Sequence, residues 1–267
     1  KSSTGCTECP IGRTSDAGSG KVCVCAAGYS GVEDWKSHPD LLTLIDASET
    51  TSTSPTDLKG TDMIWEAMET VNYVAASGDE GPYWDMNAGF FETSTRRVVG
   101  NSYTLFYYWK PMGSRLWKDL HRGGTYYDYW ALIETTSLGF YAYQRGGTNF
   151  YDTSHDITLN IWQTLIITGV GTNGVGTSTF YVNGFQVGSV PRVASGDTTY
   201  RIGRDSEYPG YVAVAGVLNT ALNTVEITSL HNHMVGTENF HAGVCNACPA
   251  GKTSDAGVGE VCAPCPL

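Results

Sequence analysis

The sequence predicts an all-β protein: an antiparallel sandwich with a small disulfide-stapled cysteine-rich module at each end. Three observations support this fold class. Residues 162–222 alternate between β-rich apolar segments and turns. Asn183-Gly184 separates two of these segments and suits the positive φ angles of a two-residue type I′ hairpin. All eight cysteines lie in two similar segments at the ends of the chain, and none lies between them.

The clearest predicted strands lie on either side of this hairpin. Residues 163–170 form an apolar run, and residues 178–190 carry two alternating segments around the turn. Residues 198–203 and 210–218 are also rich in β-forming side chains. Consecutive strands joined by short turns are typical of one antiparallel sheet.

A short helix is predicted directly after these strands. Asn223 can cap its first turn, and Glu226, three residues later, can close a capping box. Ile227, Leu230 and Met234 then fall on one helical face. We therefore expect the helix to pack that face on the sheet.

These segments follow one another in a characteristic order. Tyr181-Val-Asn-Gly184 is followed by Arg201-Ile-Gly203, by a strand that begins with glycine, and by Ala221-Leu222 with Glu226-Ile227. In this order and spacing, residues 101–234 resemble the laminin G-like, or concanavalin A-like lectin and glucanase, jelly roll. The resemblance implies a jelly-roll sandwich.

The preceding part of the chain is expected to supply further strands of the same sandwich. Residues 41–46 are predicted as the first strand, and residues 58–100 as strands and turns, with a short helix over 62–74 as the alternative. From Tyr103 the alternation is clear, because Tyr103, Leu105, Tyr107 and Trp109 fall on one face and Thr104, Phe106 and Tyr108 on the other. Segments 116–120, 129–133, 138–144 and 149–152 continue a meander.

Serine, threonine and proline dominate the loop at residues 48–57. Such a composition cannot form a core, and in a secreted protein it suits O-glycosylation. The candidate acceptors are Thr50, Thr51, Ser52, Thr53, Ser54 and Thr56. A solvated loop without sugar is the alternative.

The two cysteine-rich segments are copies of one pattern. Both contain Cys-Pro-x-Gly-[Arg/Lys]-Thr-Ser-Asp-Ala-Gly, and the cysteines are Cys6, Cys9, Cys23 and Cys25 in the first copy and Cys245, Cys248, Cys262 and Cys265 in the second. The surrounding glycine, serine and threonine favour disulfide-stapled secreted modules, although the spacing also permits zinc. We therefore predict a module with linker at residues 1–32, a jelly roll at 33–240 and a second module at 241–267.

These modules resemble the ephrin-receptor-like and tumour necrosis factor receptor-like cysteine-rich repeats of extracellular proteins. The resemblance implies that the first cysteine pairs with the third and the second with the fourth. The implied disulfides are Cys6–Cys23, Cys9–Cys25, Cys245–Cys262 and Cys248–Cys265. The residues themselves leave three pairings open in each module.

Charge and composition narrow the function classes. The net charge of −11 disfavours nucleic-acid binding, and no apolar run approaches the roughly eighteen residues of a membrane span. The chain begins at Lys1 without a signal-peptide pattern, so we expect a mature secreted product or a segment of a longer chain. The carboxylate pair that glycoside hydrolysis needs is absent, and Asp205-Ser-Glu207 is better explained as a solvated turn. We expect no enzyme activity.

One stretch is predicted to contact a glycan or a protein partner: Tyr126, Tyr127, Asp128, Tyr129 and Trp130. Sugars stack on aromatic faces and hydrogen-bond to nearby carboxylates, although alternating aromatics also fill sandwich cores. The laminin G-like resemblance implies a possible calcium site, for which Asp128, Asp205 and Glu207 are candidates at no defined location. His231 and His233 are explained as polar residues of a helix end rather than metal ligands. No other cofactor is expected.

Two hypotheses of function follow. The first is a non-enzymatic, secreted structural or adhesive glycoprotein, a repeating subunit of an extracellular filament, surface hair or coat that self-associates through its terminal modules. The alternative is a lectin-like carbohydrate-binding module of a surface protein. The duplicated cysteine pattern motivates the first, and the aromatic stretch around Trp130 motivates the second.

Overall fold

The computed structural model describes residues 35–50, 52–59, 63–77, 80–112, 117–123, 129–144, 147–203 and 208–235, with residues 13–14, 24–25, 252–253 and 263–264 near the ends. The chain divides into two compact units. One comprises Lys36–Val235, and the other comprises Lys1–Trp35 with Gly236–Leu267. No helix in the described part of the chain is both long and apolar enough to cross a membrane.

The larger unit contains a 13-stranded antiparallel sheet and one α-helix. Its strands are β3 (Leu41–Asp46), β4 (Trp65–Val74), β5 (Tyr83–Val98), β6 (Ser102–Lys110), β7 (Trp117–Gly123), β8 (Tyr129–Glu134), β9 (Ser137–Gln144), β10 (Gly147–Asp156), β11 (Gln163–Thr172), β12 (Val175–Val182), β13 (Phe185–Val190), β14 (Thr198–Ile202) and β15 (Gly210–Leu218). Short 3₁₀ helices span Trp35–Ser37 and Ala47–Glu49, and α1 spans Thr224–Val235. The all-β prediction is confirmed.

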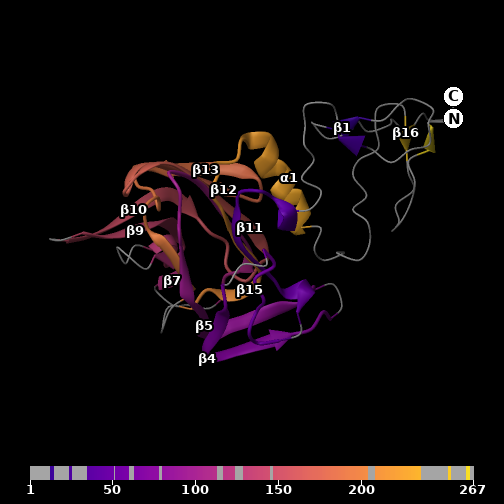
Figure 1. The fold of residues 1–267 in the computed structure, drawn as a ribbon, viewed down its shortest axis with the longest axis horizontal. Helices are drawn as coiled ribbons and strands as arrows, with labels where there is room; N and C mark the ends of the chain where they lie inside the picture. Colours follow the sequence, from indigo (N-terminus) through magenta and orange to yellow (C-terminus); the bar gives the residue numbers. More distant parts are fainter. Residues whose placement is uncertain are drawn as a thin grey trace. The chain divides into compact units, whose positions relative to one another are not determined.

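Strand β5 joins the two halves of this sheet. Its first residues pair with β15, where Trp84 lies opposite Val212, and its later residues pair with β14, where Phe91 lies opposite Ile202. The strand order is β10-β9-β8-β7-β14-β5-β15-β6-β11-β12-β13, with β3 beside β15 and β4 beside β5. The sheet curls so that its two end strands, β10 and β13, approach each other (Figure 1). It is therefore a sandwich built from one continuous sheet.

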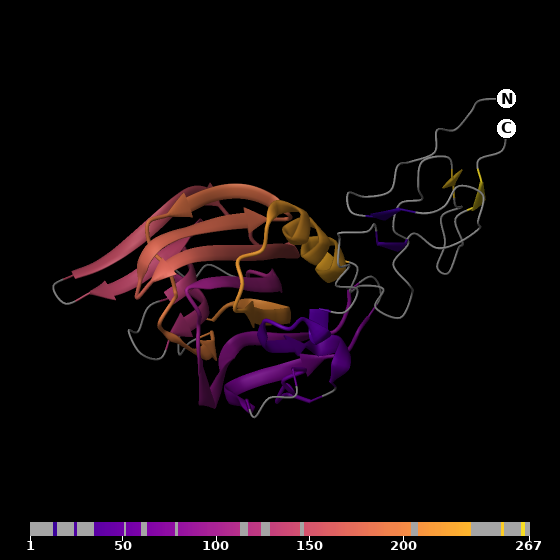
Figure 2. The same cartoon turned by 45° about the horizontal axis from the view of Figure 1, so that its top comes forward.

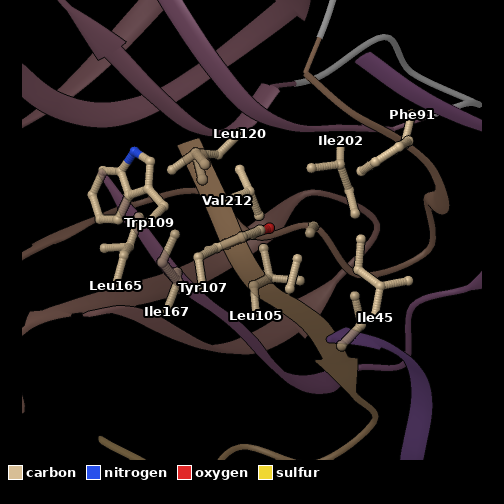
Figure 3. Packing of buried hydrophobic residues seen from close by; sticks show 14 of the residues in the cluster. Ile45, Phe91, Leu105, Tyr107, Trp109, Leu120, Leu165, Ile167, Ile202 and Val212 are labelled. Carbon is tan, nitrogen blue, oxygen red and sulfur yellow. The ribbon is translucent and has the colours of Figure 1, made fainter. Parts of the chain in front are cut away.

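The core lies between the two halves. Leu105, Tyr107 and Trp109 of β6 are fully buried and point into it together with Leu165 and Ile167 of β11 (Figure 3). Leu120, Ile202 and Phe91 come from the opposite half. The predicted division of β6 into two faces is confirmed, and the structure shows that the face with Leu105, Tyr107 and Trp109 points into the core.

The opposite face of β6 is buried as well. Thr104, Phe106 and Tyr108 are almost inaccessible to solvent. The chain that leads into α1 covers part of this face, because Thr104 Oγ1 donates to the Thr220 carbonyl and accepts a hydrogen bond from the Leu222 amide. Helix α1 lies beside the strands of this unit (Figure 2) and buries its apolar stripe of Ile227, Leu230 and Met234.

The predicted turn and helix cap are confirmed. Asn183 and Gly184 have φ angles of 51° and 79°, as a type I′ turn requires. The Val225 amide donates to Asn223 Oδ1 over 2.9 Å, and the Asn223 amide donates to Glu226 Oε2 over 2.8 Å, which closes the capping box.

Within the range of the alternative short helix, Trp65–Val74 forms strand β4. Trp65 and Val71 are buried, and the Trp65 indole donates to Thr43 Oγ1 over 3.1 Å. Strand β4 pairs with β5 along its whole length, except at a bulge between Thr70 and Asn72, next to which Glu69 takes a φ of 60°. Pairing with a long neighbouring strand outweighs the helical spacing of the sequence.

The described edges of the sheet are protected in three ways. The two end strands, β13 and β10, lie directly against each other. The approach is so close that a methyl group at Gly188 of β13 would lie 2.6 Å from the Thr153 carbonyl oxygen of β10. At β3, the Leu58 amide donates to the Leu44 carbonyl, and buried Asp57 accepts from the Leu44 amide. At β4, the bulge interrupts the strand, and the exposed Glu66 and Glu69 carry charge.

The two cysteine-rich copies have the same local backbone pairing. Arg13–Thr14 (β1) pairs with Val24–Cys25 (β2), and Lys252–Thr253 (β16) pairs with Ala263–Pro264 (β17). These segments occupy equivalent positions of the repeated pattern, and their registers correspond residue by residue. Cys25 lies in β2, whereas Cys6, Cys9, Cys23, Cys245, Cys248, Cys262 and Cys265 lie outside the described residues. Disulfide formation and the domain boundaries stay predictions.

A thiol assay decides between disulfides and zinc in these modules. We expect the native chain, unfolded without reductant, to show no free thiol, because all eight cysteines are predicted to be paired. Treatment with reductant should then release eight thiols. Thiols that react without reductant, accompanied by stoichiometric zinc, would instead establish the metal-bound alternative.

A buried polar network joins the two halves across the core. Tyr107 Oη of β6 lies 2.7 Å from His121 Nδ1 of β7, and His121 Nε2 lies 2.8 Å from Thr199 Oγ1 of β14. Complete burial of the ring lowers the pKa of His121 from 6.5 to about 3. The folded protein therefore holds this imidazole neutral at pH values where an unfolded chain protonates it.

Acid should consequently destabilise the fold through His121. Between about pH 6.5 and about pH 3 the unfolded chain binds a proton that the folded chain does not, so the free energy of unfolding falls as pH decreases. The slope contributed is at most about 1.4 kcal/mol per pH unit. Denaturant unfolding of wild type and His121→Gln between about pH 6.5 and about pH 3 measures this slope. Glutamine is suitable because it keeps a polar side chain that does not titrate.

The difference between the two proteins isolates His121 from other groups, including His231, whose pKa burial also lowers. Equal slopes for wild type and variant would contradict the prediction. If His121→Gln does not fold, an NMR titration of the wild-type ring gives the same answer, since the ring signals should not shift above about pH 4.

Candidate functional site

Four aromatic side chains gather on the outer face of the sheet, opposite the core. We call Tyr83, Tyr108, Trp162 and Tyr211 the aromatic cluster. The rings of Tyr83 and Tyr211 stack with centroids 4.7 Å apart, and Tyr83 meets Trp162 edge-on at 5.5 Å. Trp162 also contacts Tyr108 at 5.1 Å. Tyr108 is buried, whereas the other three rings are half-buried and thus partly open to solvent.

Strand register brings these residues together. Tyr211 of β15 lies opposite Asp85 of β5 on one side and Lys110 of β6 on the other. Directly paired residues project from the same face, so Asp85, Tyr211 and Lys110 form a row across three strands. Tyr83 and Tyr108 lie two residues before Asp85 and Lys110, which places them on that face too.

The residues between them point the other way. Trp84, Val212 and Trp109 occupy the alternate positions of β5, β15 and β6, and all three are fully buried in the core. The aromatic cluster is therefore the solvent side of strands whose opposite side is fixed by core packing. This gives the cluster a rigid support.

An ion pair borders the aromatic cluster. Lys110 Nζ lies 2.7 Å from Glu80 Oε1 and 5.7 Å from the centroid of the Tyr211 ring. Trp162 also hydrogen-bonds to the Glu80 carboxylate. The Lys110 hydrogen bond and charge, with the contribution of Trp162, lower the pKa of Glu80, so this carboxylate is ionised at neutral pH.

The electrostatic environment of the aromatic cluster is acidic. Burial raises the pKa of Tyr83, and Tyr211, Glu80 and Asp85 raise it further. Asp85 Oδ1 accepts hydrogen bonds from the amide and side-chain nitrogen of Asn87. The arrangement thus combines aromatic surfaces with carboxylate, amide and ammonium groups, which are the partners that sugar hydroxyls use.

Helix α1 flanks the aromatic cluster on the β11 side. Thr164, which lies opposite Tyr108, hydrogen-bonds through Oγ1 to His231 Nδ1 over 2.8 Å. His231 therefore holds the helix to the sheet. No group of three or more histidine, cysteine, aspartate or glutamate side chains in the described ranges is arranged to hold a metal ion.

The predicted aromatic stretch lies in the other half of the sandwich. Tyr126, Tyr127 and Asp128 fall outside the described residues, and Tyr129 and Trp130 begin β8. Tyr129 pairs in register with Arg122 of β7 and with Tyr141 of β9, and Tyr141 pairs with Phe150 of β10. Tyr141 and Phe150 are half-buried. The backbone of Tyr129 therefore pairs in a part of the sheet separate from the aromatic cluster.

The other predicted sites are placed only in part. Ser52, Thr53, Ser54 and Thr56 are exposed and Thr50 is half-buried, whereas Thr51 lies outside the described residues. The loop is anchored through its backbone, because the Trp84 indole donates to the Ser52 carbonyl over 3.0 Å. The calcium candidates Asp128, Asp205 and Glu207 also lie outside the described residues.

Sequence reasoning did not find the aromatic cluster as a site. A local signal was present: Tyr83 and Trp84 are adjacent, as are Tyr108 and Trp109, and adjacent residues of a strand face opposite sides. One member of each pair therefore had to lie on the outer face. The partners of these residues could not be predicted, because they come from strands distant in sequence.

The sequence matches no protein-family model and no curated protein. Solved structures nevertheless share its fold. Domain 4 of AbnA, a GH43 extracellular arabinanase from Geobacillus stearothermophilus in complex with arabinotriose, is 17% identical, with a TM-score of 0.56 over 72% of this chain and 98% of that domain.

Botulinum neurotoxin structures resemble this chain to a similar degree. The binding domain of botulinum neurotoxin DC in complex with SialylT is 14% identical, with a TM-score of 0.54 over 73% of this chain. A structure of botulinum neurotoxin type C, whose cell entry depends on interaction with two ganglioside molecules, is 13% identical with the same TM-score and coverage. The chain spans about half the length of these toxin chains, 51% in both cases. At these identities the likeness shows the fold, an all-β jelly-roll sandwich.

Proposed function

We propose that the sandwich is a lectin-like carbohydrate-binding domain that holds its ligand on the aromatic cluster. The observation that carries the proposal is the contact of three half-buried rings on one rigid sheet face, bordered by Asp85 and the Glu80–Lys110 ion pair. Sugar rings stack on aromatic faces while their hydroxyls bond to planar polar groups. Structures of the same fold include an arabinanase domain in complex with arabinotriose.

Location and activity form part of the same proposal. The cysteine-rich ends favour an oxidising, extracellular setting, and one similar structure belongs to an extracellular arabinanase. We propose that the protein is secreted and binds glycans without turning them over. Glu80 forms an ion pair with Lys110, which lowers its pKa and keeps it ionised. Acid catalysis needs a protonated carboxyl, so this ion pair supports a binding role.

Trp162→Ala and Tyr211→Ala should abolish or weaken glycan binding at least about tenfold, which corresponds to about 1.4 kcal/mol. A glycan array followed by affinity measurement on the best ligand tests this. Phe185→Ala is the matched control, because Phe185 is a 76% exposed aromatic residue on β13, outside the aromatic cluster. Thermal melts verify that each variant is folded.

Trp130→Ala locates the site in the same assay. If Trp130→Ala removes binding while Trp162→Ala does not, the glycan lies near β8 and the assignment to the aromatic cluster is wrong. If no glycan binds wild type on a broad array, the lectin proposal itself fails.

A second proposal concerns the ends of the chain. The repeated cysteine pattern forms the same backbone ladder in both copies, which supports a role as equivalent connectors in a structural or adhesive assembly. Under this proposal the full-length chain assembles into fibres with a regular axial repeat at high concentration, seen by negative-stain electron microscopy. Light scattering that reports a monomer throughout a wide concentration range would remove this proposal and leave the lectin proposal standing.

A further inference from the structure

The charges at the aromatic cluster bear on which class of glycan it accepts, an inference that rests on the proposed function. Among the described residues, the charged groups in contact with these rings or paired in register with them are two carboxylates, Glu80 and Asp85, and one ammonium, Lys110. The charges of these described groups therefore sum to one negative charge. The whole chain carries a net charge of −11 and adds to the same potential.

The ammonium group of Lys110 already has an ion-pair partner. Lys110 lies 2.7 Å from Glu80 and over the Tyr211 ring, and its side chain is only 17% exposed. The Glu80 side chain is 43% exposed and so faces an incoming ligand more openly than its partner does. A ligand anion would have to displace Glu80 from Lys110 before it gained a positive partner.

Asp85 adds a second negative group on the other side of Tyr211. It is half-buried and pairs in register with Tyr211, so a ligand that contacts the exposed part of this ring lies close to its carboxylate. Asp85 accepts hydrogen bonds from Asn87, which keep the carboxylate in place without neutralising it. Two sugar hydroxyls can donate one hydrogen bond each to Asp85 and Glu80, whereas a ligand carboxylate or sulfate cannot donate to either.

We propose that the aromatic cluster selects neutral, hydroxyl-rich glycans and rejects glycans whose terminal unit carries a carboxylate or a sulfate. The two negatively charged acceptors, Glu80 and Asp85, hydrogen-bond to hydroxyl donors and repel anions at the same positions. Selectivity of this kind arises as much from repulsion of the wrong ligand as from contacts with the right one.

The test uses matched glycan pairs on the full-length chain, each pair consisting of a neutral glycan and the same glycan capped with sialic acid or sulfate. The readout is the ratio of the two affinities, measured by surface plasmon resonance for wild type, Glu80→Gln and Asp85→Asn. Wild type should prefer the neutral member at least about tenfold. Both variants should have a smaller preference for the neutral member than wild type. The decrease should be larger for Glu80→Gln, because this substitution also frees Lys110 from its ion pair.

Glu66→Gln is the matched control, since Glu66 is an exposed carboxylate on β4 outside the aromatic cluster, and it should leave the ratio unchanged. Raising the salt concentration to about 1 M, where the screening length is about 3 Å, should also narrow the wild-type ratio. A wild-type preference for acidic members that Trp162→Ala abolishes would overturn the inference while the lectin proposal stands. Binding to neither member of any pair would overturn both.

Discussion

The alternation of side chains along β6 is the constraint on which both faces of the sandwich depend. Tyr107 and Trp109 point into the core, while Tyr108 and Lys110 point to the opposite face. A shift of register by one residue would exchange the two sets. The shift is prevented because β6 is paired on both sides, with β11 and with β15, and seven of its nine residues are buried. Core packing therefore also fixes the groups that border the aromatic cluster.

Features encoded by neighbouring residues were predicted from sequence. The Asn183-Gly184 turn, the Asn223 capping box and the division of β6 into two faces each depend on a few adjacent positions, and the structure confirms all three. The aromatic cluster was missed because it depends on non-local pairing of β5, β6 and β15. The sequence instead predicted a contact site at the aromatic residues around Tyr129. That residue lies in a different half of the sheet, where its register partner is Tyr141.

Fold alone does not determine what such a sandwich binds, because one architecture carries many sites. The similar structures include complexes with two different ligands, arabinotriose and SialylT. What this chain binds therefore depends on its own residues. Under the proposed function, Tyr83, Trp162 and Tyr211 supply the stacking surfaces, and Glu80 and Asp85 determine the charge that a ligand meets.

The protection of the sheet edges has a consequence for crowded settings. A strand that presents unpaired amides and carbonyls can recruit the same strand of another molecule and start irreversible aggregation. Here β13 lies against β10, β3 is covered by the Asp57 segment, and β4 carries a bulge and two glutamates. Many copies held close together on one surface would thus meet through side chains alone. Contacts of that kind are reversible, so dense display of the domain would not by itself start aggregation.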